Sequence, residues 1–221
     1  DMERRDLLMI VVLSAAGHLL FDLINSFGVQ LFWPFSLMRP ELAIIFIIDF
    51  ILAGLLAAPR LARLRTAWRP TLPRASQAAL FLVAVYLAGA FAARQRALAL
   101  LEREARGSFT YAFPEPLGPH RWRGTVKDPG SWRVYLIDVA RGSVEKRLVL
   151  PDDADAAPAL AAGRTAFGRR LSSFFTAPVW TVSPRPEGGA TASVRDLRFT
   201  ALTLARASAF EYVFDVGADG R

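Results

Sequence analysis

The sequence predicts three membrane-spanning helices followed by a small antiparallel α+β domain. Of its 221 residues, 53% are apolar, the mean hydropathy is +0.28, and there is no cysteine. The apolar residues gather in three long stretches within residues 1–106, whereas residues 107–221 alternate apolar and polar positions between turn residues, as β-strands do. We therefore expect a transmembrane domain over residues 1–106 and an extracytoplasmic α+β domain over residues 107–221.

Composition also excludes several classes of protein. Apolar content this high excludes intrinsic disorder, and the absence of cysteine excludes a disulfide scaffold, a cysteine zinc site and a cysteine nucleophile. The net charge of +7 divides into +4 over residues 1–106 and +3 over residues 107–221. Since neither half holds a basic run interleaved with aromatic residues, we expect no nucleic-acid partner.

A helix that crosses a bilayer needs roughly 20 mostly apolar residues. Three stretches are suited to this, at about residues 7–25, 42–58 and 75–92, and a connecting helix should follow the third. A cleaved signal peptide is disfavoured for the first stretch, because His18 and Asp22 interrupt it and no small-x-small cleavage site follows. A soluble helical bundle is disfavoured because the stretches are apolar on all faces.

The placement of arginine predicts the orientation of these spans in an inner (cell) membrane. Arg4 and Arg5 precede the first span, and the connection between the first and second spans holds only Arg39, offset by Glu41. The connection between the second and third spans holds five arginines: Arg60, Arg63, Arg65, Arg69 and Arg74. Because arginine concentrates on the cytoplasmic side, we expect a multi-pass protein with residues 93–221 outside the cytoplasm.

The sequence pattern of residues 107–221 is typical of a small antiparallel domain. The predicted strands are residues 109–113, 122–126, 132–139, 144–150, 179–183, 191–199 and 210–216. The pairs Pro129-Gly130 and Arg141-Gly142 predict turns. One amphipathic helix is expected over residues 155–175, with Asp152, Asp153 and Asp155 at its N-terminus. Four aromatic residues are expected in the core: Trp122, Trp132, Trp180 and Phe199.

Ionisable residues inside membrane spans are costly, so each one indicates a partner or a function. His18 and Asp22 are four residues apart and therefore share one helix face, which Asn25 continues. Asp49 falls near the middle of the second predicted span. An imidazole and a carboxylate so placed can form a structural hydrogen bond or share a divalent cation. The spacing leaves both interpretations open and favours the hydrogen-bonded pair.

Residues 18–36 resemble the hallmark segment of the YdjM/YbcI-type family of bacterial and archaeal inner-membrane proteins, which are described as membrane-bound metal-dependent hydrolases. In that family the segment reads approximately H-x-x-x-D-x-x-T-x-x-G-x-x-x-x-x-P-F. Asn25 stands here where threonine is common. The positions that match are His18, Asp22, Gly28, Pro34 and Phe35.

The resemblance extends beyond this segment. The next span of the family often carries an aspartate in an I-x-D setting, matched here by Ile47-Ile48-Asp49. Segments 119–124, 196–199 and 215–220 are similar to the C-terminal domain of some members. The histidine and aspartate motifs that precede the hallmark segment in the family do not occur in this sequence. We therefore expect the chain to be the C-terminal part of a longer protein, with upstream transmembrane segments as partners.

The resemblance implies a metal-dependent hydrolase with a divalent ion, of which zinc is one candidate. His18 and Asp22 would hold the ion, and Asp49 would be a further ligand or would lie next to one. Because these residues lie within the predicted membrane spans, a lipid-like, membrane-associated substrate is expected. The sequence assigns no catalytic residue, since it holds no G-x-S-x-G, no H-E-x-x-H and no phosphate-binding glycine loop. The alternative is a non-enzymatic, membrane-anchored binding or scaffold module in which His18 and Asp22 form a structural clasp.

Overall fold

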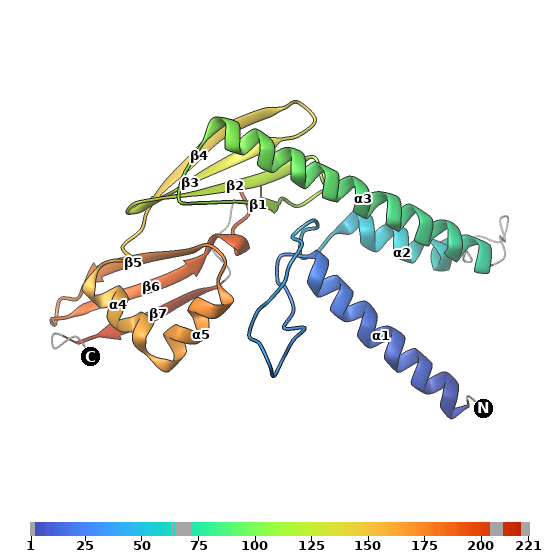
Figure 1. Ribbon diagram of the computed structural model, residues 1–221, viewed down its shortest axis with the longest axis horizontal. Coiled ribbons are helices and arrows are strands. Elements are labelled where there is room, and N and C mark those ends of the chain that lie inside the picture. The colour runs from blue at the N-terminus through green and yellow to red at the C-terminus, as the bar shows by residue number, and fades with distance from the viewer. Residues whose placement is uncertain (1–2, 63, 65–71, 204–209, 218–221) are drawn as a thin grey trace. The chain divides into compact units, whose positions relative to one another are not determined.

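The computed structural model describes residues 3–62, 64, 72–203 and 210–217, and it divides into two compact units (Figure 1). The helical unit, residues 1–91, contains α1 (Arg4–Ile24), α2 (Phe50–Ala62) and the first part of α3 (Leu72–Glu104). The β-rich unit, residues 92–221, contains the rest of α3 and all the strands. The predicted order, apolar helices first and antiparallel strands second, is confirmed.

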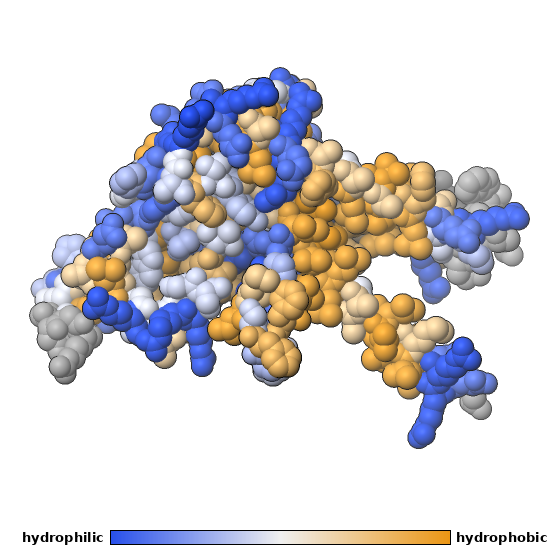
Figure 2. Space-filling model, in the orientation of Figure 1, coloured by the Kyte–Doolittle hydropathy of each residue, from blue (hydrophilic) through white to orange (hydrophobic). Residues whose placement is uncertain are grey.

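Within the described residues, two helices are long and apolar enough to cross a membrane: α1, and α3 from Pro73 to Glu104. On α1 only Ile24 is buried, and apolar side chains such as Leu8 and Leu13 are both 65% exposed. Figure 2 shows this hydrophobic surface over the helices, with hydrophilic side chains at the N-terminal end of α1. An exterior that is apolar all round suits a lipid solvent and not water.

The second predicted span does not start where the sequence indicated. Residues 42–49 are not helical, and α2 begins only at Phe50. The backbone before α2 bonds to the end of α1 instead of forming a helix: the N–H groups of Leu42 and Ile44 donate to the carbonyls of Leu23 and Ile24. The 13 residues of α2 rise only about 20 Å, less than the roughly 30 Å of a bilayer core.

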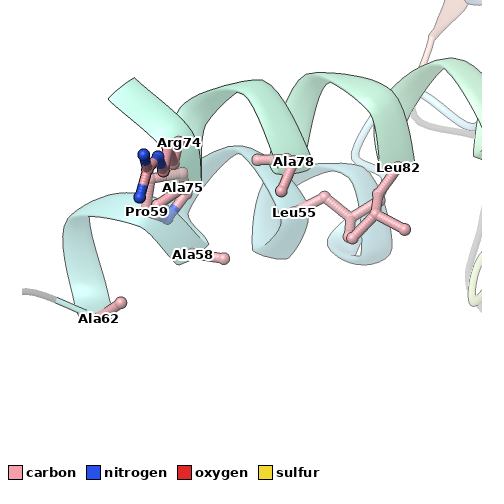
Figure 3. Close-up of a pocket in the computed structure, with 9 residues that line it drawn as sticks. Leu55, Ala58, Pro59, Ala62, Arg74, Ala75, Ala78 and Leu82 are labelled. Atoms are coloured by element: carbon pink, nitrogen blue, oxygen red, sulfur yellow. The ribbon is translucent and has the colours of Figure 1, made fainter. Parts of the chain in front are cut away.

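Apolar packing joins these elements at the C-terminal end of α1. Ile24 of α1, Ile44 and Ile45 of the connection, Leu52 of α2 and Ala90 of α3 are all buried in one cluster. Farther along, α2 and α3 line an open apolar pocket of about 350 Å³, with Leu55 and Leu82 in its lining and Arg74 at one end (Figure 3). The rest of that lining is small: Ala58, Pro59, Ala62, Ala75, Ala78 and Ala79. Small residues of this kind let two helices approach closely in a membrane.

The first sheet of the β-rich unit is an antiparallel meander in the order β1-β2-β3-β4. Its strands are β1 (Phe109–Pro114), β2 (Arg121–Asp128), β3 (Ser131–Asp138) and β4 (Ser143–Pro151). All four agree with the predicted strands, and both predicted turns are confirmed, with Gly130 and Gly142 at φ of 69° and 70°. Glycine is preferred at such positions because it adopts positive φ without steric cost.

The C-terminal part of α3 packs on this sheet. Its Ala97 and Leu101 are fully buried against Trp122, Val126 and Ile137. The close approach depends on Gly124, because a Cβ at that position would lie only 2.7 Å from a methyl group of Leu101.

The second sheet has the order β5-β6-β7, with strands Pro178–Pro184, Ala190–Asp196 and Glu211–Val216. The single helix predicted over residues 155–175 is wrong: the structure has α4 (Ala157–Arg164) and α5 (Ala166–Phe174). Thr165 separates them, because its backbone is extended and its side chain caps α5 by accepting from the Gly168 N–H. The strand predicted to reach residue 199 ends at Asp196, whose side chain caps the short 3-10 helix Leu197–Phe199.

The aspartates expected at a helix N-terminus have a different role. Asp152 accepts hydrogen bonds from the backbone N–H of Trp180, at 2.8 Å, and from the Trp132 indole, at 3.2 Å. Asp153 accepts from the N–H of Val182 at 2.9 Å. Both therefore hold β5 in place, and the helix that follows has no side-chain cap. The predicted aromatic core is confirmed, with Trp122, Trp132 and Trp180 buried and Phe199 partly buried.

A two-bond ion pair ties the β2–β3 hairpin, and it predicts a pH dependence. Arg133 donates to both carboxylate oxygens of Asp128, which lowers the pKa of Asp128. A depressed folded-state pKa contributes stability above the unfolded-state pKa of about 4, and this contribution is lost as the pH falls through the lower folded-state value. We expect Asp128→Asn to lower the free energy of unfolding at pH 7, and the difference from the native protein to disappear near pH 2. A difference that stays constant with pH in urea titrations would contradict the ionic origin.

Candidate functional site

The candidate site begins with two side chains on one face of α1. His18 and Asp22 lie one helical turn apart, and the distance from the His18 Nε2 to the Asp22 Oδ2 is 3.5 Å. The His18 side chain is 78% exposed and the Asp22 side chain 32% exposed. The sequence prediction that these groups share one helix face is confirmed.

The separation between the two polar atoms suits a shared metal ion as well as a direct contact. Two ligands at 2.0–2.1 Å from one tetrahedral ion stand about 3.4 Å apart. A charge-assisted hydrogen bond is shorter, at about 2.7–2.9 Å. The geometry is therefore close to that of two ligands of one ion, and it is long for a strong hydrogen bond.

Asn25, which continues the same stripe in the sequence, has a structural role. It is buried, and its side-chain oxygen accepts from the backbone N–H of Phe27 at 2.6 Å. Its own carbonyl accepts from the N–H of Ala43. Asn25 thus ends α1 and starts the turn that follows, as the residue type favours.

Asp49 lies at the N-terminus of α2 and not in the middle of a helix. One carboxylate oxygen accepts from the Leu52 N–H at 2.9 Å, the bond that a helix N-cap residue makes. The other accepts from the Tyr86 hydroxyl of α3 at 2.6 Å. Both oxygens of Asp49 are therefore engaged within the helical unit.

Tyr86 is the partner that the sequence did not indicate. It lies 37 residues from Asp49, and nothing local to either residue connects them. An N-cap signal was present, because an aspartate directly precedes the apolar run that becomes α2. The continuous apolar run on both sides of Asp49 masks that signal, because it resembles a single uninterrupted span.

A cavity of about 250 Å³ lies beside Asp49. Phe21 of α1 reaches it, so residues adjacent to Asp22 and to the α2 cap share its wall. The remaining lining is apolar: Ile45, Ile47, Ile48, Leu52, Ala53 and Leu56. Asp49 is the one residue of the candidate site that lines this cavity, and His18 and Asp22 do not line it.

The described residues offer an incomplete set of metal ligands. In the described part of the chain, no group of three or more His, Cys, Asp or Glu side chains comes close enough to hold one ion. His18 and Asp22 form a pair, and Asp49 does not complete it. A hydrolytic zinc site ordinarily has three protein ligands and an open position for water, and the pair His18 and Asp22 supplies two such ligands.

The segments of the β-rich unit that the sequence singled out hold buried arginines and aspartates that bond to one another. Within segments 119–124 and 196–199, Arg123, Asp196 and Arg198 are buried. Arg123 donates to Glu115 at 2.8 Å and to the Arg198 carbonyl at 3.1 Å. Burial lowers the pKa of Arg123, and Glu115 and Asp196 oppose that effect. These groups are bonded to one another in the interior, so they stabilise the fold and are not placed to meet a ligand.

Comparison with known proteins identifies the helical part of the chain. Residues 2–97 match the family described as YdjM inner membrane protein. No curated protein and no solved structure matches the chain. The match includes His18, Asp22, Asp49 and Tyr86 and ends within α3, so the similarity expected for the β-rich unit stays a prediction. The resemblance to the YdjM inner membrane protein family that the motif from His18 to Phe35 predicted is therefore confirmed over residues 2–97.

Proposed function

We propose that this chain is part of an inner-membrane, metal-dependent hydrolase in which His18 and Asp22 hold a divalent ion. The observation that carries the proposal is the 3.5 Å separation of the His18 Nε2 and the Asp22 Oδ2 on one face of α1. A further donor, from an upstream segment of the same protein, would reach the ion on this open face. Asp49 is a candidate for a further ligand or for a residue next to a ligand, because it lines one cavity together with Phe21, which precedes Asp22 on α1.

The chemistry follows from the ion and the depth of the site. A divalent ion lowers the pKa of a bound water and so supplies a nucleophile at neutral pH. His18 is six residues from the end of α1, about 9 Å along the helix axis. A substrate that reaches this depth must be amphiphilic, and we propose a lipid-like molecule with a hydrolysable bond, such as a phosphoester, near its polar end.

The proposal is tested by the metal content of the purified full chain after equilibration with zinc. We expect His18→Ala and Asp22→Asn each to lower bound zinc more than about tenfold, since each removes a charged or imidazole ligand. His120→Ala is the matched control, because His120 is the only other histidine and lies exposed in the β-rich unit. Equal zinc content in all four proteins would refute the site.

A second candidate function is favoured by the incomplete ligand set among the described residues. In this case the chain is a non-enzymatic, membrane-anchored binding or scaffold module, and His18 and Asp22 act as a clasp. The double variant His18→Ala, Asp22→Asn would then show a coupling free energy of roughly 0.5–2 kcal/mol in stability measurements, with no dependence on metal. Coupling that appears only with zinc present would favour the hydrolase.

We also propose that the chain crosses the membrane three times, with α2 and the extended residues before it as the second crossing. The antiparallel packing of α2 against α3 around the pocket of Figure 3 supports this. Non-helical backbone at membrane depth is tolerated where protein buries it, and Ala43, Ile44 and Ile45 are buried. Arg4, Arg5, Arg60 and Arg74 then lie on the cytoplasmic side, whereas Arg63, Arg65 and Arg69 lie outside the described residues.

Reporter fusions test this topology. Alkaline phosphatase fused after Arg221 should be active, and a fluorescent protein fused there should be dark, because three crossings place the C-terminus outside the cytoplasm. A fluorescent protein fused after Leu64 should be bright. If α2 does not cross, both results reverse, so either reversal would replace the three-span arrangement with a two-span one.

A further inference from the structure

The segment between α1 and α2 contains a loop whose tip is almost entirely apolar and exposed. The tip, residues 30–38, holds no charged residue. Phe35 is 93% exposed, Trp33 67% and Leu37 64%. The other large apolar side chains of the tip are also exposed: Leu31, Phe32 and Met38. An exposed apolar group of this size marks a surface that is covered in the working protein.

The neck of this loop is closed, so the tip projects as a defined element. The Val29 N–H donates to the Pro40 carbonyl at 3.2 Å, and Arg39 donates to the carbonyls of Phe27 and Gly28. Gly28 permits the closure, because it has a φ of 67° and a Cβ there would lie 3.1 Å from the Pro40 oxygen. Figure 1 shows the segment as an irregular loop that leaves the C-terminal end of α1.

The backbone of the tip satisfies much of its own hydrogen bonding. The N–H groups of Leu31, Trp33 and Phe35 donate to carbonyls within the loop, at 2.8–3.2 Å. Ser36 also donates to the Phe32 carbonyl, and its hydroxyl accepts from the Met38 N–H. Pro34 has no N–H to satisfy. Irregular backbone enters lipid only when its polar groups are bonded internally, and this tip meets much of that requirement.

We propose that the tip, residues 30–38, inserts into the bilayer leaflet at which the C-terminal end of α1 lies. The neck is bonded to the end of α1, through the Leu42 and Leu23 backbones, so the tip and the helix end share the same membrane surface. Tryptophan and phenylalanine suit that interfacial depth, and Arg39 at the neck stays at the polar boundary. The occupant of the apolar surface is therefore lipid. This inference requires α1 to be in the membrane and is independent of any metal at His18.

The absence of cysteine makes the test direct, because a single introduced cysteine carries the only label. Phe35→Cys in the full chain is spin-labelled, reconstituted in phosphatidylcholine–phosphatidylglycerol vesicles, and its collision with oxygen and with a water-soluble nickel chelate is measured. Leu37→Cys is a second tip position. Leu13→Cys on α1 is the lipid-exposed reference, and Ala140→Cys in the exposed β3–β4 turn is the water-exposed reference.

We expect the tip labels to fall between the two references, because the tip lies at interfacial depth, with oxygen collision at least about fivefold favoured over nickel relative to Ala140→Cys. Nickel access at the tip equal to that at Ala140→Cys would overturn the insertion. Low collision with both reagents would also overturn it, since a second copy of the chain or another protein would then cover the tip. If the Leu13→Cys label itself meets nickel, α1 is not in the membrane, and the proposed function fails together with the insertion.

Discussion

Glu115→Ala is expected to lower the free energy of unfolding of the β-rich unit by about 3–5 kcal/mol, because it leaves a buried guanidinium without its counter-charge. The side chains of Glu115 and Arg123 are both fully buried, with 2.8 Å between the Arg123 Nη1 and the Glu115 Oε1. Glu115 also accepts from the Leu202 N–H, and from the N–H and hydroxyl of Thr203. Alanine removes all of these acceptors at once.

Two further variants separate charge from hydrogen bonding. Glu115→Gln keeps the shape and part of the bonding, so we expect a smaller loss of about 1–3 kcal/mol. Glu145→Ala is the matched control, because Glu145 pairs with Arg147 at 2.6 Å on the exposed β4 strand, and it should cost less than about 1 kcal/mol. Urea unfolding of the full chain in detergent, followed by tryptophan fluorescence, measures all three. A Glu115→Ala effect no larger than that of Glu145→Ala would refute the role of the buried pair.

The strands of the β-rich unit could be predicted because their signals are local. Alternation of apolar and polar side chains fixes which face of a strand is buried, and turn glycines such as Gly130 fix where a strand ends. The same applies to His18 and Asp22, whose common face follows from a four-residue spacing. Each of these features depends on residues within one turn or one hairpin.

The features that could not be predicted depend on distant partners. Asp152 and Asp153 resemble helix-capping residues in sequence, yet they bond to Trp180 and Val182, which lie 28 and 29 residues away. Arg123 reads as an outward-facing strand residue, and only the placement of Glu115 and Arg198 makes it a buried one. In both cases hydrogen bonds to distant residues satisfy a charged side chain. The local sequence pattern alone places that side chain in solvent or at a helix end.

The helical unit shows the same limit at Asp49. A hydropathy window over residues 42–58 contains one carboxylate and otherwise apolar residues, so it indicates a continuous span with a buried charge. The structure instead uses the carboxylate to start a helix, and a tyrosine 37 residues away bonds its second oxygen. The assignment of Asp49 as a metal ligand rests on a position within the span and on family resemblance, and it stays a prediction.

Asp49→Leu is expected to destabilise the helical unit by about 2–4 kcal/mol. The loss of an N-cap costs about 0.5–2 kcal/mol, and the Tyr86 hydroxyl left without an acceptor costs about 1–3 kcal/mol. Tyr86→Phe removes the hydrogen bond to the second Asp49 oxygen and keeps the N-cap, so we expect a smaller loss, near 1 kcal/mol. Denaturation of the full chain by sodium dodecyl sulfate in mixed micelles, followed by circular dichroism, compares the three proteins.

Asp49→Asn decides whether this residue also holds a metal ion. Its amide oxygen can still accept from Tyr86 or cap α2, so most of the stability should remain. If capping is the whole role of Asp49, the Asp49→Asn protein should bind as much zinc as the native chain does. The Asp22→Asn protein, in contrast, should have lost the metal. If Asp49→Asn instead loses zinc with its stability intact, the carboxylate is a ligand or the direct support of one. In that event the α2 N-terminus must approach His18 and Asp22 more closely when the ion is bound, since the described residues hold no three-donor group.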